Sequence, residues 1–74
     1  MAKKEGSAVY RVTEVIGTSS DSWEDAARNA VKTAGATLRD LRIAEVTKLD
    51  VRIDDNGKIA QFRARLALSF KYEG

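Results

Sequence analysis

The sequence predicts an α+β fold in which a β-α-β-β chain forms a three-stranded antiparallel sheet packed on one helix. Three observations support this prediction: strand-forming residues concentrate near both ends of the chain, alanines recur at helical spacing between them, and an Asn-Gly turn joins the last two strands. The length of 74 residues fits a single domain. We expect residues 1–7 to form a flexible N-terminal tail and residues 8–74 to form the domain.

Residues 9–16 predict the first strand. Their sequence, Val-Tyr-Arg-Val-Thr-Glu-Val-Ile, is rich in the β-branched and aromatic residues that strands favour. Gly17 follows directly, and because glycine commonly marks a turn we expect the strand to end there. Glu14 lies among apolar neighbours, where the simplest explanation is an ion pair across a sheet edge or a subunit boundary.

A helix is predicted after residues 18–22, which supply several N-cap oxygens. Two pairs of residues have the spacing of a capping box: Asp21 with Glu24, and Ser22 with Asp25. The apolar side chains that follow recur every three or four residues and predict one helical face: Trp23, Ala26, Ala27, Ala30, Val31, Ala34, Leu38 and Leu41. This face places Arg39 in the last helical turn, where the helix dipole favours a cation.

The last two strands are predicted over residues 43–53 and 59–72. In the later strand, even-numbered apolar residues alternate with mostly polar odd-numbered ones, whereas Glu45 and Thr47 interrupt the alternation of the earlier strand. Residues 54–57, Asp-Asp-Asn-Gly, predict a hairpin because Asn-Gly supplies the two positive φ angles of a type I′ turn. With a right-handed crossover after the first strand, the predicted strand order is 1-3-2.

The composition argues against several classes of protein. No apolar run approaches the roughly 18 residues of a membrane span, and the basic N-terminus lacks the apolar segment of a signal peptide, so we expect a cytoplasmic protein without a membrane partner. The net charge of +2 is small and the charges are interspersed, which indicates no nucleic-acid partner. The chain has no histidine and no cysteine, so it offers no thiol nucleophile, no imidazole base and neither of the usual zinc ligands. No other catalytic candidate stands out, and we expect no enzymatic activity.

The chain is too short to cover its own sheet. The strands of the predicted sheet span roughly 40 Å at about 3.3 Å per residue, and one helix of about four turns cannot cover that length. Small domains without disulfides or metals often gain stability by oligomerisation. We therefore expect copies of the same chain to cover the exposed apolar surface.

The roles of three side chains stay open at this stage. Trp23 is expected to pack at the helix start or against another subunit, with stacking on a ligand ring as the alternative. Arg63 and Arg65 lie on the face opposite the apolar one. A monomer would leave these cations solvated, whereas an oligomer could aim them at an anion or at Glu45 and Asp50.

Several segments carry a family resemblance. They are residues 9–19, Val-Tyr-Arg-Val-Thr-Glu-Val-Ile-Gly-Thr-Ser, the alanine-rich helix, Arg42-Ile43-Ala44-Glu45-Val46 and Leu66-Ala67-Leu68-Ser69-Phe70. With these segments the chain resembles the dodecins over residues 8–72. The resemblance implies a strand-helix-strand-strand subunit that assembles as a hollow homododecamer of cubic 23 symmetry, in which neighbours complete and cover the sheet.

The resemblance also implies a small-molecule partner, a flavin such as FMN or riboflavin, stored at subunit interfaces without catalysis. Ile43 and Arg63 stand where flavin-binding dodecins have a stacking tryptophan and a hydrogen-bonding glutamine, which implies weak flavin binding at most. Arg65 and Lys71 fall near positions that meet phosphate groups in some relatives. The ligand-binding residues implied in this way are Ile43, Glu45, Gln61, Arg63, Arg65 and Lys71.

An alternative function follows from similarity to the calcium dodecin subgroup. The segment Ser22-Trp23-Glu24-Asp25-Ala26-Ala27 carries this similarity, together with Arg42-Ile43-Ala44. It implies a structural or cation-binding assembly without an organic ligand, in which Asp21 binds calcium or magnesium as one of three carboxylates around a three-fold axis. A plain helix-start carboxylate that interacts with backbone N–H groups is the alternative for Asp21.

Overall fold

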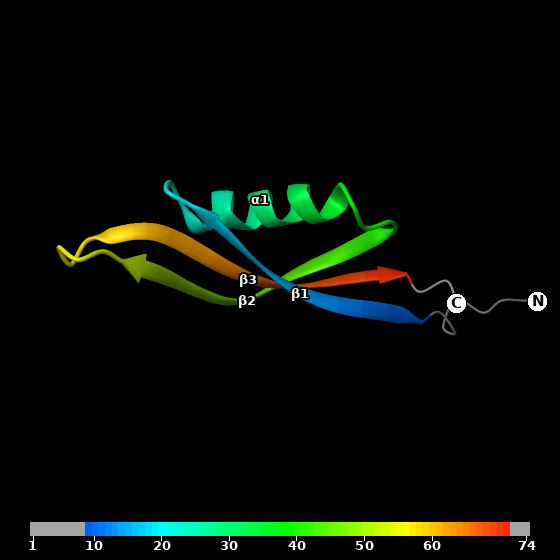
Figure 1. Cartoon of the computed structure of the whole chain (residues 1–74). Coiled ribbons are helices and arrows are strands. Elements are labelled where there is room, and N and C mark those ends of the chain that lie inside the picture. Colours follow the sequence, from blue (N-terminus) through cyan, green and yellow to red (C-terminus); the bar gives the residue numbers. More distant parts are fainter. Residues whose placement is uncertain (1–8, 72–74) are drawn as a thin grey trace, which may run out of the picture.

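The computed structural model describes residues 9–71, and the expected tail, residues 1–7, lies outside this range. The elements in chain order are β1 (Tyr10–Ser19), α1 (Trp23–Gly35), β2 (Leu41–Ile53) and β3 (Ile59–Lys71). The strands form one sheet in the order β1-β3-β2, with β3 antiparallel to both neighbours, and α1 lies across one face of it (Figure 1). The predicted fold class and strand order 1-3-2 are therefore confirmed.

The core lies between α1 and the centre of β3. Three alanines of the helix, spaced four residues apart, are buried against the alternating apolar residues of β3, as the sequence pattern predicts. Small helix side chains let the helix approach the sheet closely. The buried apolar residues among those described are Ala26, Ala30, Ala34, Ala64, Leu66 and Leu68.

The helix begins at the predicted capping pair of Ser22 and Asp25. Ser22 is the N-cap, and its Oγ accepts a hydrogen bond of 3.0 Å from the backbone N–H of Asp25. The carboxylate of Asp25 accepts a second hydrogen bond, of 2.7 Å, from the Oγ of Ser19 at the end of β1. These bonds tie the end of the first strand to the first turn of the helix.

The helix ends earlier than the apolar pattern predicts. Its last residue is Gly35, so Arg39 does not lie in the last turn. Glycine lowers helix propensity, and Asp40 with a φ of 56° turns the chain sharply into β2. Leu38 and Leu41 still pack on the core, but from the turn and from β2 instead of from the helix. The apolar spacing therefore predicts correctly that Leu38 and Leu41 pack on the core, but it is wrong in placing them on the helix.

Gly17 does not end the first strand. β1 continues through it to Ser19, and Gly17 pairs with Ala64 at the centre of the sheet. A Cβ at this position would collide with the backbone oxygen of Ala26 and would lie 2.8 Å from the Cβ of Ala30. The glycine therefore serves the close approach of strand and helix and makes no turn.

A β-bulge explains the interrupted alternation of β2. Val46 pairs with Leu66 and Lys48 pairs with Arg65, so Thr47 is an extra residue between two pairs. The Oγ of Thr47 donates a hydrogen bond of 3.2 Å to the backbone oxygen of Arg65. Because the bulge shifts the register by one residue, apolar side chains on both sides of it share the face that α1 covers.

The hairpin between β2 and β3 has a different turn from the one predicted. Gly57 donates its N–H to the oxygen of Asp54 over 3.0 Å, and the N–H of Asp54 donates to Lys58 over 2.8 Å. Gly57 has a φ of 79°, whereas Asn56 is not left-handed. This is a three-residue loop with a type I turn followed by a left-handed glycine, so the antiparallel pairing is confirmed and the type I′ turn is wrong.

The helix covers only part of the sheet. Thirteen helical residues span about 20 Å at about 1.5 Å each, whereas the thirteen residues of β3 span about 43 Å at about 3.3 Å each. The covered part holds the buried core, and large apolar residues are exposed on both sides of the sheet beyond it. No helix within residues 9–71 is long and apolar enough to cross a membrane.

Replacing Gly17 with alanine should destabilise the protein by about 1–3 kcal/mol, because the added methyl group forces strand and helix apart in a packed core. Replacing Gly35 with alanine is the matched control, since a Cβ there meets nothing within 4 Å. The free energy of unfolding, measured by chemical denaturation at equal protein concentration, checks both variants. Equal stability of the two variants would contradict the packing role of Gly17.

Candidate functional site

The face of the sheet opposite α1 gathers most of the predicted site residues. We call this surface the open face, because no element within residues 9–71 covers it (Figure 1). Residues that pair across neighbouring strands share a face, and this register defines which side chains lie on it. The predicted residues on the open face are Ile43, Glu45, Gln61, Arg63 and Arg65.

One half of the open face is apolar. Ser69 of β3 pairs with Val12 on one side and with Ile43 on the other, so these three residues form one row across the sheet. The exposed fractions of Val12 and Ile43 are 61% and 60%, and the serine between them is small. In the next row Ala67 lies between Glu14 and Glu45. The result is a shallow, partly apolar surface bordered by carboxylates.

The other half of the open face carries ion pairs within the chain. The Nε of Arg63 lies 2.8 Å from an oxygen of Asp50, which is its cross-strand partner. A terminal nitrogen of Arg65 lies 3.9 Å from a carboxylate oxygen of Glu14 on the edge strand β1. Each arginine therefore has an intrachain carboxylate partner, and the expected ion pair of Glu14 is found. All four side chains remain partly exposed to solvent.

Gln61 lies at the far end of the same half. Its side-chain oxygen accepts a hydrogen bond of 3.3 Å from the Nε of Arg52. Its neighbour Arg63 is six residues along β3 from Ser69, the residue opposite Ile43, a separation of about 20 Å at about 3.3 Å per residue. A single small ligand on one chain cannot touch both Ile43 and Arg63. The fold places these residues on one face without bringing them together.

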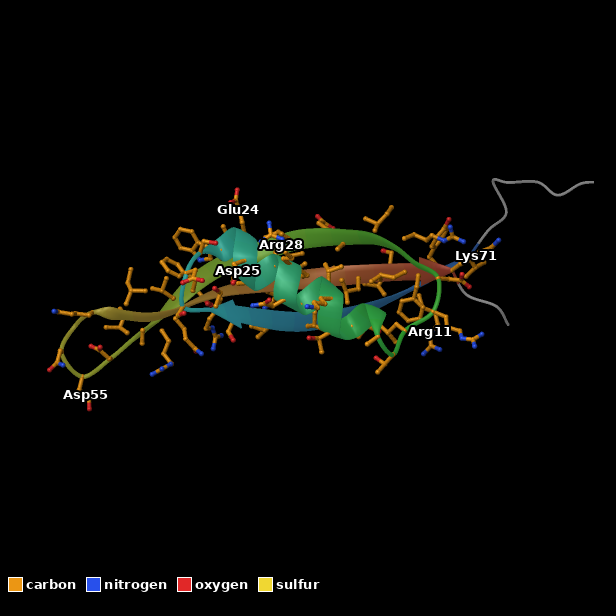
Figure 2. The ribbon with its side chains drawn as sticks, turned by 90° about the horizontal axis from the view of Figure 1, so that it is seen from above. Arg11, Glu24, Asp25, Arg28, Asp55 and Lys71 are labelled. Atoms are coloured by element: carbon orange, nitrogen blue, oxygen red, sulfur yellow. The ribbon has the colours of Figure 1, made fainter. Side chains whose placement is uncertain are left out.

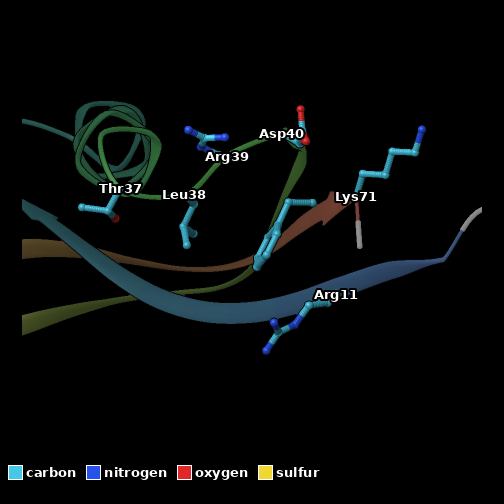
Figure 3. Close-up of a pocket in the computed structure, with 7 residues that line it drawn as sticks. Arg11, Thr37, Leu38, Arg39, Asp40 and Lys71 are labelled. Carbon is cyan, nitrogen blue, oxygen red and sulfur yellow. The ribbon is translucent and has the colours of Figure 1, made fainter. Parts of the chain in front are cut away.

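Lys71 lies apart from the other predicted site residues. It lines a hollow of about 320 Å³ at the end of the sheet, beside the turn that follows α1 (Figure 3). Arg11 and Arg39 also line this hollow, but Lys71 and Arg11 point to opposite sides of the sheet (Figure 3). The cationic groups at this end therefore diverge, and they do not form a closed anion site within one chain.

Trp23 has a structural role in the chain. Its indole N–H donates a hydrogen bond of 3.0 Å to the backbone oxygen of Asp50 in β2. Its ring meets the ring of Phe62 edge to face, with centroids 5.1 Å apart. Both contacts join the start of α1 to the β2-β3 hairpin, which confirms the packing role expected for this residue.

Asp21 directly precedes the N-cap, away from the open face. Its backbone N–H donates to the Oγ of Ser19 over 2.8 Å. Figure 2 shows two other acidic residues of this end, Glu24 and Asp25, on the first helical turn. Within residues 9–71 no three acidic side chains gather closely enough to hold a metal ion. A cation at Asp21 would need ligands from other copies of the chain.

Comparison with known proteins decides the family. The sequence profile of the dodecin family matches residues 9–73. The chain belongs to the dodecin family. A solved dodecin from Streptomyces coelicolor has 46% identical residues and superposes with a TM-score of 0.84, over 92% of this chain and 96% of that one. A dodecin from Streptomyces davaonensis, 31% identical, superposes with a TM-score of 0.82 over 92% and 98%.

Calcium dodecin from Mycobacterium tuberculosis is a further relative of this dodecin. The two sequences are 45% identical over 64 residues, which cover 86% of this chain and 89% of the relative. The crystal structure of that protein superposes with a TM-score of 0.78, over 88% of this chain and 91% of that one. That structure is described as having a novel calcium-binding site.

Sequence reasoning missed part of the open face. Val12 and Ser69 complete the row of Ile43, yet neither was selected as a site residue. In β1 the alternating pattern of the sequence is sufficient to identify Val12, because the even-numbered residues of this strand lie on the face that α1 leaves uncovered. In β2 the bulge at Thr47 hides the signal, because it changes which residues share a face.

Proposed function

We propose that this dodecin assembles as a homododecamer and binds a small, flat ligand between the open faces of neighbouring copies, without catalysing a reaction. A flavin such as FMN or riboflavin is the proposed ligand class. The observation that carries the proposal is the separation of Ile43 from Arg63 on one exposed, partly apolar face. A small ligand that contacts both Ile43 and Arg63 must therefore lie between two chains.

The composition of the open face suits such a ligand. Exposed Val12 and Ile43 offer apolar contact to a ring, and Glu45 can accept hydrogen bonds from ring N–H groups. The half-exposed cations Arg63 and Arg65 suit carbonyl oxygens or a phosphate. A ligand of this kind would be sequestered and released, since no titrating nucleophile or base is supplied by histidine or cysteine.

Ile43 should make flavin binding weak. Stacking of a ring on an aromatic side chain contributes about 1–3 kcal/mol, and isoleucine lacks this interaction. Each 1.4 kcal/mol corresponds to about tenfold in affinity, so the loss amounts to about tenfold to a hundredfold. Arg63 adds to the loss, because a guanidinium donates hydrogen bonds but cannot accept them as a glutamine amide can.

Native mass spectrometry tests the assembly first. Twelve chains of 8.1 kDa give about 97 kDa, and we expect this mass together with little or no retained flavin. A monomer of 8.1 kDa would contradict the assembly and the shared site together. A smaller oligomer, such as a dimer or trimer, would contradict the dodecamer alone.

Restoring the aromatic and amide groups should strengthen flavin binding by about tenfold to a hundredfold. The variant is I43W combined with R63Q, and quenching of flavin fluorescence on titration measures its affinity. The matched control is I16W, which adds the same indole to the opposite edge strand of the open face. Equal flavin affinity of the double variant, the control and the wild type would contradict a ligand site at Ile43.

A second candidate function is calcium binding, which the 45% identity to calcium dodecin favours. Calcium takes six to eight oxygen ligands, more than one chain offers near Asp21. Three copies around a three-fold axis would supply three carboxylates at one point. In this proposal the dodecamer binds cations where its subunits meet, with no organic ligand, and magnesium is a weaker competitor.

The variant D21N should lower calcium affinity at least tenfold if Asp21 contributes one carboxylate per subunit, since a neutral amide loses the charge that holds a hard cation. Isothermal titration of the assembled protein with calcium chloride measures the effect. The control is D55N, which removes a carboxylate at the exposed hairpin turn (Figure 2). Unchanged calcium affinity in D21N would exclude Asp21 as a ligand.

A further inference from the structure

The hairpin formed by residues 52–61 extends past the first turn of α1 (Figure 1). We call it the hairpin arm. β1 ends where Ser19 pairs with Phe62, so beyond this point the arm has two strands and no helix above it. Two-stranded hairpins are only marginally stable alone in water. The arm nevertheless exposes two large apolar side chains, with exposed fractions of 61% and 55% for Ile53 and Ile59.

A groove with matching chemistry lies between α1 and β2. It has a volume of about 470 Å³ and an apolar floor made by both elements and by β3. The exposed fractions of Val31 and Val46 are 36% and 46%, although both belong to this floor. The apolar lining residues are Ala27, Val31, Ala44, Val46 and Leu66. We call this hollow the α1-β2 groove.

We propose that the hairpin arm of one copy lies in the α1-β2 groove of a neighbouring copy. The contact rests on the proposed assembly and names the surfaces that would form it. The arm extends away from the groove of its own chain, so it cannot fill that groove itself (Figure 1). Each copy then gives one arm and receives one. A head-to-tail contact of this kind forms a ring when the rotation between copies closes, as it does around the axes of a closed oligomer.

Charge favours this groove over the second hollow beside the helix. The helix contributes two cations, Arg28 and Lys32, and one carboxylate, Glu24, to the α1-β2 groove, so the groove keeps a net positive charge. The tip of the arm carries Asp54 and Asp55. The side chain of Arg28 is 71% exposed and pairs with Asp25 at 3.4 Å, so it can reach a partner on another chain. Opposite charges on the two surfaces stabilise this contact and fix its register.

The second hollow lacks this complementarity. It lies between α1 and β1 and has a volume of about 440 Å³. Its polar lining residues are uncharged: Thr18, Asn29, Thr33 and Thr37. An arm with an acidic tip would gain nothing there beyond apolar contact. The two sides of the same helix therefore provide an internal comparison for the proposal.

A second copy is the occupant that the structure favours. The arm and the groove belong to the same chain, so they are present in equal number at every protein concentration. Two apolar side chains are a small contact by themselves, but a ring forms this contact twice for each copy. A foreign partner would have to supply both an apolar groove and a rim of net positive charge, which this chain already provides.

Engineered disulfides test the contact, because the sequence contains no cysteine. The test variant combines I53C on the arm with V31C in the α1-β2 groove. The control combines I53C with T33C, which lies in the second hollow on the same helix. Both proteins are assembled, oxidised mildly in air, and run on denaturing gels without reductant, and the native mass of each sample is measured beforehand.

We expect the I53C/V31C protein to give a ladder of linked chains, whereas I53C/T33C and each single variant stay unlinked. An assembled oligomer without linked I53C/V31C chains would overturn the arm contact and leave the assembly intact. Linked chains in the I53C single variant would show arms meeting one another and would also overturn it. A monomer in the native mass would instead overturn the proposed assembly, and the arm contact with it.

Discussion

The different rise of helix and strand is the constraint on which this structure depends. Thirteen residues of α1 span about 20 Å, while thirteen residues of β3 span about 43 Å, so one helix cannot cover the sheet in a β-α-β-β chain of this size. The covered length becomes the core, and the close contact at Gly17 makes this part compact. The rest of the sheet presents apolar side chains to whatever surrounds the chain.

The open face shows how one sheet combines a surface that forms the core with a surface that stays exposed. On β3 the even-numbered residues pack under α1, and the odd-numbered residues form the middle of the open face. The bulge at Thr47 keeps β2 in the same arrangement despite its interrupted alternation. Ion pairs of Arg63 and Arg65 with Asp50 and Glu14 hold the cations in place without burying them. Partly exposed pairs of this kind contribute little to stability, so they leave the chemistry of this face free to vary.

Much of the fold could be predicted from the sequence, because local patterns and tertiary packing agree in β3 and α1. The alternation of β3 and the alanine spacing of α1 each named their buried residues correctly. The errors occur at glycines, because glycine is common both in turns and at close contacts between elements. Gly17 was interpreted as a turn because glycine is common in turns, but it is required by close packing. The Asn-Gly pair predicted the hairpin correctly but not its turn, since only Gly57 is left-handed.

The site could be predicted less completely than the fold. Sequence patterns assign residues to faces, and five of the predicted residues do share the open face. Patterns do not show how far apart residues of two different strands lie, or which surface another copy of the chain would contact. The separation of Ile43 from Arg63 appears only once the register is known.

The hairpin arm also affects how the chain folds. Its closing pair, Ile53 and Ile59, joins residues that are near in sequence, whereas Tyr10 pairs with Lys71 from the opposite end of the chain. Local pairs close faster than distant ones, so we expect the arm to form before β1 completes the sheet. During that interval its apolar strands are open to pairing with other nascent chains. We expect the charged turn, with Asp54, Asp55 and Lys58, to limit aggregation during this interval.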